Sequence, residues 1–144
     1  MTRLLRRLLA ARDGSTIVEL GLLAPLMCAL LLGVLQVGIG MHSYNALRGI
    51  SSDVARYAIV QYQTDNELGN SQLTDYARSV AISPPYGLQD SDVQVSVANA
   101  TTQRVAGAKE LTFTITYTID SFLGVIGLQD FSISFTRPIF VLDD

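Results

Sequence analysis

The most prominent pattern in the chain is a long apolar run near its N-terminus. No charged side chain occurs between residues 20 and 47, counting His42 as neutral. As a helix, residues 20–41 would extend about 33 Å at ~1.5 Å per residue, enough to cross the roughly 30 Å core of a bilayer. Their eight leucines favour insertion by about 4 kcal/mol. The pattern predicts a transmembrane helix over residues 15–41; the alternative, a buried core helix, needs a larger domain around it.

Helical spacing continues beyond this run. Apolar residues keep the 3, 4, 7 spacing of one helix face as far as Ala58, and the polar run 63–70 ends it. A second apolar face between residues 73 and 80 predicts a short helix. We expect Ser71 to cap this helix, and Pro84 and Pro85 to stop it.

The period then changes from helical to two. Apolar and polar residues alternate over 93–97, 111–119 and 131–136, which predicts three strands. The apolar stretch 122–127 predicts a short turn or a minor fourth strand. The expected fold is therefore α+β, with a small antiparallel sheet of three or four strands whose apolar face lies on the helices. Pro138 favours an edge position for the last strand. The Thr/Ser face of the sheet is either solvated or a binding surface for a glycan or another strand.

Charge is distributed unevenly along the chain. Residues 1–14 carry four arginines against Asp13, a net charge of +3, whereas residues 15–144 carry six basic and twelve acidic side chains, a net of −6. The acidic body argues against a nucleic-acid partner. Arginines before the apolar run place residues 1–14 in the cytoplasm as a leader and residues 42–144 outside as one extracytoplasmic domain. A cleaved secretory signal is the rival, but the run is too long and no small-x-small cleavage site ends it.

A short motif precedes the membrane segment. The basic leader ends in Gly14, and Glu19 is the fifth residue after it. This arrangement resembles a type IV prepilin processing site. The resemblance implies cleavage between Gly14 and Ser15 by a prepilin peptidase, after which Glu19 of one subunit neutralises the new amine of its neighbour. A snorkelling interfacial Glu19 near a helix N-terminus is the simpler alternative.

Further motifs narrow the family. The sequence continues with Val-Glu-Leu at 18–20, Ala-Pro-Leu at 24–26, Tyr-Asn-Ala at 44–46 and Ala-Arg-Tyr-Ala at 55–58. Residues 12–60 resemble a TadE-like protein, a minor pilin-like component of the Tad (tight adherence) system that makes Flp pili. Gln36 stands where that family often carries an acid. The resemblance implies other pilin-like subunits and Tad pilus assembly proteins as partners, beside the membrane lipid.

The membrane helix carries a stripe of small residues. The stripe comprises four residues at i+4 spacing: Gly21, Pro25, Ala29 and Gly33. Such stripes let helices approach closely in lipid, although small residues are also common in membrane helices generally. Gln36 is expected to donate and accept hydrogen bonds across a helix pair, and Pro25 to bend or loosen the helix.

Catalytic chemistry is not expected. Cys28 and His42 have no catalytic or ligand partner in the sequence, and the pair Asp90 and Asp92 lacks the rest of a calcium loop. We therefore expect no enzyme activity, no cofactor and no metal. The sequence predicts a pilin-like subunit (minor pilin or pseudopilin) or assembly factor of a Tad-type adhesion or secretion apparatus, held in a bacterial inner membrane by a single pass, with transfer into a pilus left open. The alternative is an unprocessed, membrane-anchored binding module.

Overall fold

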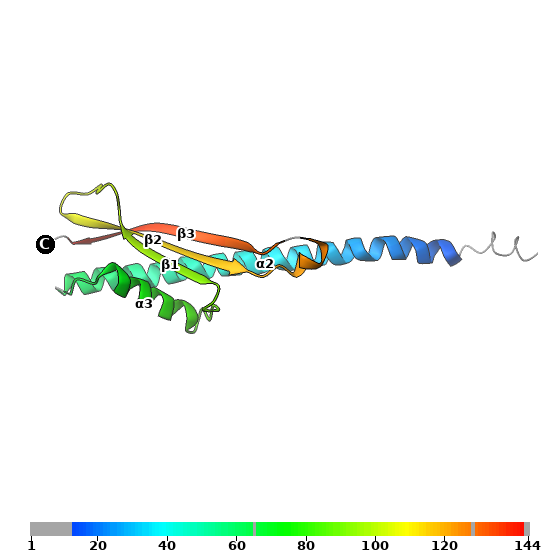
Figure 1. The fold of residues 1–144 in the computed structure, drawn as a ribbon, viewed down its shortest axis with the longest axis horizontal. Coiled ribbons are helices and arrows are strands. Elements are labelled where there is room, and N and C mark those ends of the chain that lie inside the picture. The colour runs from blue at the N-terminus through cyan, green and yellow to red at the C-terminus, as the bar shows by residue number, and fades with distance from the viewer. Residues whose placement is uncertain (1–12, 65, 128, 143–144) are drawn as a thin grey trace, which may run out of the picture.

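The protein is a long helix with a small helix-and-sheet domain along its C-terminal half. The computed structural model describes residues 13–64, 66–127 and 129–142, with side chains from residue 16 onward except 125 and 126. The elements in chain order are α2 (Asp13–Gln63), α3 (Asn70–Ile82), β1 (Val93–Asn99), β2 (Ala108–Ile119), the 3₁₀ helix η1 (Phe122–Ile126) and β3 (Phe131–Leu142). The predicted α+β class is confirmed (Figure 1).

The three described strands form an antiparallel sheet in the order β1-β2-β3. The register places Val97 opposite Phe113, and Ile115 opposite Phe135. Pro138 faces Thr112 from β3, an edge strand, as its missing N–H requires. Apolar and polar residues that alternate along each strand therefore point to opposite faces of the sheet.

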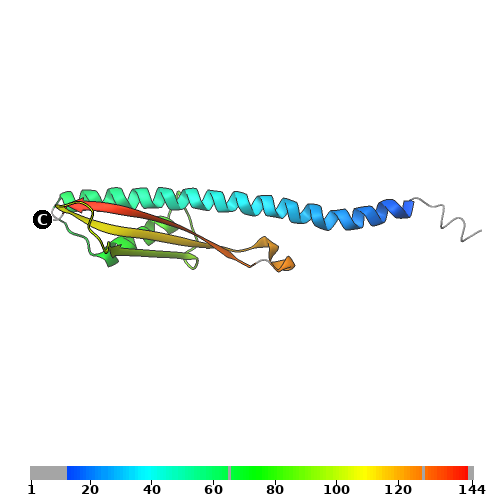
Figure 2. The same ribbon diagram turned by 90° about the horizontal axis from the view of Figure 1, so that it is seen from above.

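One face of the sheet is buried against α2 and α3. Figures 1 and 2 show the strands running alongside the C-terminal half of α2, with α3 beside it. Side chains from α2, α3 and the sheet share the core, and the largest fully buried ones are Phe113, Leu47, Ile50, Leu73, Leu111, Ile115 and Ile139. Burial of these apolar surfaces stabilises the fold.

Two local details differ from the sequence predictions. The N-cap of α3 is Gly69 rather than Ser71, and the Gln72 side chain accepts a hydrogen bond from the Gly69 N–H at 2.8 Å. Glycine is tolerated at the N-cap, and a Gln at the third helical position satisfies the N–H of the cap residue itself. Residues 122–126 form a 3₁₀ helix, so the alternative of a fourth strand there is wrong.

Contacts between α2 and the rest of the chain begin before residue 42. The side chains of residues 16–35 are mostly exposed, with Leu22 at 74% and Leu31 at 70%, whereas Gln36 is only 8% exposed. None of the most apolar window of α2 is buried, so this segment is not a core helix of the single chain. Gln36, within the predicted transmembrane segment, is hydrogen-bonded to the loop after β2, and the division of the chain at residue 42 remains a prediction.

Candidate anchoring and assembly site

The predicted processing bond lies at the start of α2. The helix begins at Asp13, so the Gly14–Ser15 bond is in its first turn. The leader arginines Arg3, Arg6, Arg7 and Arg12 lie outside the described residues. Glu19 is exposed and follows Ser15 by four residues, which puts both on one face of the helix. Their roles in cleavage and assembly stay predictions.

The small-residue stripe is open surface in the single chain. No atom from elsewhere in the described chain comes within 4 Å of where a Cβ on Gly21 or Gly33 would stand. The helix runs unbroken through Pro25. Gly33 lies three residues before Gln36, so the stripe continues the helix face on which the sheet packs. The stripe therefore offers room for a close neighbour, and its role in packing remains a prediction.

Gln36 has partners that the sequence did not indicate. Its Nε2 donates to the Asp120 carbonyl at 3.3 Å, and its Oε1 accepts from the Phe122 N–H at 3.0 Å. The residue predicted to bridge two helices thus binds the main chain of its own β2–η1 loop. A polar side chain on an apolar helix is stabilised only when paired, and here both ends are paired within the molecule.

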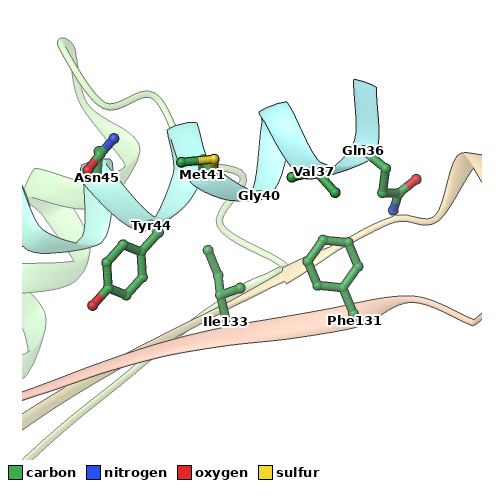
Figure 3. Close-up of a pocket in the computed structure, with 8 residues that line it drawn as sticks. All are labelled: Gln36, Val37, Gly40, Met41, Tyr44, Asn45, Phe131 and Ile133. Carbon is green, nitrogen blue, oxygen red and sulfur yellow. The ribbon is translucent and has the colours of Figure 1, made fainter. Parts of the chain in front are cut away.

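An apolar cleft of about 460 Å³ lies between α2 and β3, and Gln36 is one of the residues that line it. Figure 3 shows its lining, which is Gln36, Val37, Gly40, Met41, Tyr44, Asn45, Phe131 and Ile133. A Cβ on Gly40 would stand 3.4 Å from the Phe131 ring, so glycine there leaves room for this ring. Tyr44 meets Phe135 edge to face, with centroids 5.8 Å apart.

The 55–58 motif packs α2 on α3. Ala58 is fully buried and Ala55 nearly so, while Tyr57 stacks on Tyr76 with centroids 3.8 Å apart. Burial is the main reason that the pKa of Tyr76 is raised, followed by the nearby Tyr57 and then Asp53. Ala55 and Ala58 of the motif thus belong to the core, and Tyr57 contacts α3.

One close approach near this motif was not predicted. Tyr86 lies across α2 at Gly49, where a Cβ would stand 2.5 Å from its hydroxyl oxygen, and that hydroxyl donates to Asp53 at 2.9 Å. Burial, then this bond, raises the pKa of Tyr86. The isolated glycine within a helical apolar pattern was the available signal for a close contact.

Two of the ion pairs among the described residues join a loop of the domain to a helix or a strand. Arg104 and Gln103 bind Glu110, which is 4% exposed; the Arg104 Nε lies 2.9 Å from Oε1. The hydrogen bond from Arg104 holds the pKa of the Glu110 carboxyl below its ordinary value. Arg78 likewise binds Asp90, with Nε 2.5 Å from Oδ1, and lowers its pKa on an exposed surface. The Asp90 carboxylate is thus engaged with a cation of the chain itself.

The structure places the remaining candidate side chains on α2 and on the outer face of the sheet. No group of three His, Cys, Asp or Glu side chains in the described part of the chain is arranged to hold a metal ion. Cys28 and His42 are both exposed on α2. On the outer face of the sheet, Thr114 bonds Thr136 at 3.0 Å and Thr116 bonds Ser134 at 3.2 Å. Hydroxyls paired across strands stabilise the sheet itself.

These features define a class: an α+β protein with a helix that, by length and composition, can cross a membrane. The sequence model of one protein family, described as "TadE-like protein", matches residues 14–56. The resemblance predicted from the sequence is confirmed over this segment, which covers the exposed part of α2 and its first packed turns. No curated protein and no solved structure matches the chain.

Proposed function

We propose that this protein is a non-enzymatic, pilin-like subunit or assembly factor of a Tad-type pilus, anchored in the inner membrane with its leader in the cytoplasm. The observation that carries the proposal is the position of the TadE-like match. The match begins at Gly14, the proposed cleavage residue, and runs along the exposed apolar helix into the domain.

The continuity of α2 supports an anchor over a secretory signal. Signal peptidase cuts after the apolar segment, which here would divide α2 before the residues that pack on the sheet. A prepilin peptidase instead cuts before the apolar segment and leaves this packing intact. The Gly14–Ser15 bond lies in a terminal turn, where local opening costs least.

The test is processing in a cell that contains a prepilin peptidase. Wild-type protein should lose 14 residues and retain 130 of its 144, beginning at Ser15. Gly14→Leu should block this cleavage, because a branched side chain fills the space that the peptidase needs at the scissile bond. Intact mass and N-terminal sequencing of membrane-extracted protein report both results.

Two variants separate cleavage from assembly. Gly21→Leu makes the same substitution seven residues further on and should leave cleavage unchanged. Glu19→Ala should be cleaved but impaired in assembly, because the partner of the Ser15 amine is lost. If Met1 or Thr2 persists in wild-type protein beside an active peptidase, the pilin-like mechanism is wrong and an unprocessed, membrane-anchored binding module remains.

A further inference from the structure

The loop between β2 and β3 carries an apolar stretch at the end of the domain nearest the exposed part of α2. Its sequence from residue 121 to 128 is SFLGVIGL, without a charge, and Asp120 and Asp130 flank it. Phe122 is 51% exposed. Figure 2 shows η1 beyond the end of the sheet, beside the apolar part of α2.

Hydrogen bonds fix the level of this loop along the helix. Gln36 binds the Asp120 carbonyl at 3.3 Å and the Phe122 N–H at 3.0 Å. The exposed residues 16–35 before it extend about 30 Å at ~1.5 Å per residue, which equals the thickness of a bilayer core. If residues 20–41 span instead, Gln36 lies about 7.5 Å inside the span. Both alignments put η1 at the membrane boundary or just within it.

Several N–H groups in the described part of the loop have partners within the protein. The N–H of Ser121 donates to Asp130 Oδ1 at 2.8 Å, and that of Leu123 to the Ser121 hydroxyl at 3.2 Å. The N–H groups of Gly124 and Gly127 donate to carbonyls within the loop at 3.2 and 3.0 Å. Non-helical backbone is tolerated at membrane depth only when its polar groups have partners in the protein.

We propose that this loop, with η1 at its centre, is a second membrane-contacting element that inserts the exposed Phe122 side chain into the boundary of the bilayer beside α2. The inference rests on the proposed membrane anchoring by α2. The loop would fix the height and orientation of the domain above the bilayer, because a helix alone leaves the domain free to rotate. Asp120 and Asp130 flank the apolar stretch and favour the shallower alignment, in which Gln36 lies at the boundary and both carboxylates reach the headgroup region.

The chain contains no tryptophan, so one introduced residue is a unique fluorophore. Full-length Phe122→Trp is reconstituted in phosphatidylcholine–phosphatidylglycerol vesicles, with and without bromine on the acyl chains, which quenches only by contact. Two matched variants complete the set. Leu31→Trp reports the helix, and Val105→Trp replaces a residue that is equally exposed, at 50%, on the loop at the opposite end of β2.

Brominated lipid should reduce the emission of Phe122→Trp by a factor comparable to that of Leu31→Trp, and leave Val105→Trp unchanged. Aqueous iodide should quench Val105→Trp alone. Circular dichroism checks that each variant retains the wild-type fold, and aromatic replacement of exposed Phe122 should preserve it.

The failures are separable. If brominated lipid quenches Leu31→Trp but not Phe122→Trp, the loop proposal is wrong and the anchor stands. The same conclusion holds if iodide also fails to quench Phe122→Trp because a second copy of the chain covers the loop. Quenching of neither overturns the anchor and the loop together. Equal quenching at 122 and 105 means that the domain adsorbs without a preferred end, which also overturns the loop proposal.

Discussion

Gly49 shows how a missing side chain determines the packing of the outer domain. Tyr86 occupies the space that a Cβ would fill, and reaches Asp53 from there. Alanine favours a helix over glycine by about 1 kcal/mol, whereas overpacking a fitted contact costs about 1–3 kcal/mol. The steric cost should win, because the nearest atom is the Tyr86 hydroxyl oxygen, which is attached to a rigid ring and hydrogen-bonded to Asp53.

We therefore predict that Gly49→Ala lowers the free energy of unfolding by up to about 2 kcal/mol net. Gly38→Ala makes the same change on the same helix, where no other part of the described chain lies within 4 Å, and should not destabilise. Urea unfolding of the full chain in detergent, followed by circular dichroism, measures both. If the two variants change the free energy of unfolding equally, Tyr86 moves away from the added methyl group without destabilising the fold, and the prediction is wrong.

Glu110 makes the stability of the domain depend on acid pH. Its pKa in the folded state is below its ordinary value because Arg104 hydrogen-bonds the carboxylate. The ionised Glu110 therefore stabilises the folded state fully above the unfolded pKa of about 4.3. This contribution to the free energy of unfolding is lost as the pH falls through the lower, folded-state pKa.

The Tm of the wild-type domain should accordingly fall as the pH is lowered below about 4. Glu110→Gln should lower the Tm at neutral pH and flatten part of that fall. Asp90→Asn removes the carboxylate that pairs with the exposed Arg78. It should change the Tm at neutral pH and the fall of the Tm in acid much less, because solvent screens that pair. Thermal unfolding between pH 2.5 and 7 tests this; an unchanged acid profile in Glu110→Gln would contradict it.

At the scale of elements, the stripe on α2 yields a separate prediction. Gly33→Leu fills the open face of the stripe while raising the apolarity of the helix, so insertion should persist and helix association should weaken. Gly38→Leu is the matched control, because Gly38 lies two residues past Gln36 and hence on the opposite side of the helix. The measurement is the yield of crosslinked oligomers in membranes. Equal yields would mean that the stripe has no role in association.

The elements themselves were largely predictable because their signals are local. The period of two fixed the faces of β2, where Leu111, Phe113 and Ile115 are all fully buried. The cap of α3 was missed because a glycine without any side-chain acceptor occupies it, and only Gln72 binds back to the Gly69 N–H. The turn at 122–126 was ambiguous because a short apolar run fits both a strand and a helical turn.

At the scale of the whole molecule, the prediction failed where partners are distant in sequence. Gln36 and Phe122 are 86 residues apart, and no periodicity connects them. The same holds for Tyr86 and Asp53, which are 33 residues apart. For this reason the contact between Gln36 and the loop after β2 could not be predicted, although the apolar segment itself was found.

The arrangement of α2 and β3 also has a mechanical consequence. The strand runs beside the helix over most of its own length, and the helix passes without interruption from the exposed segment to the sheet (Figures 1 and 2). A force that draws α2 along its axis therefore loads the interface in shear, so that many side-chain contacts must fail together. Helix and sheet should move under such a load as one stiff body.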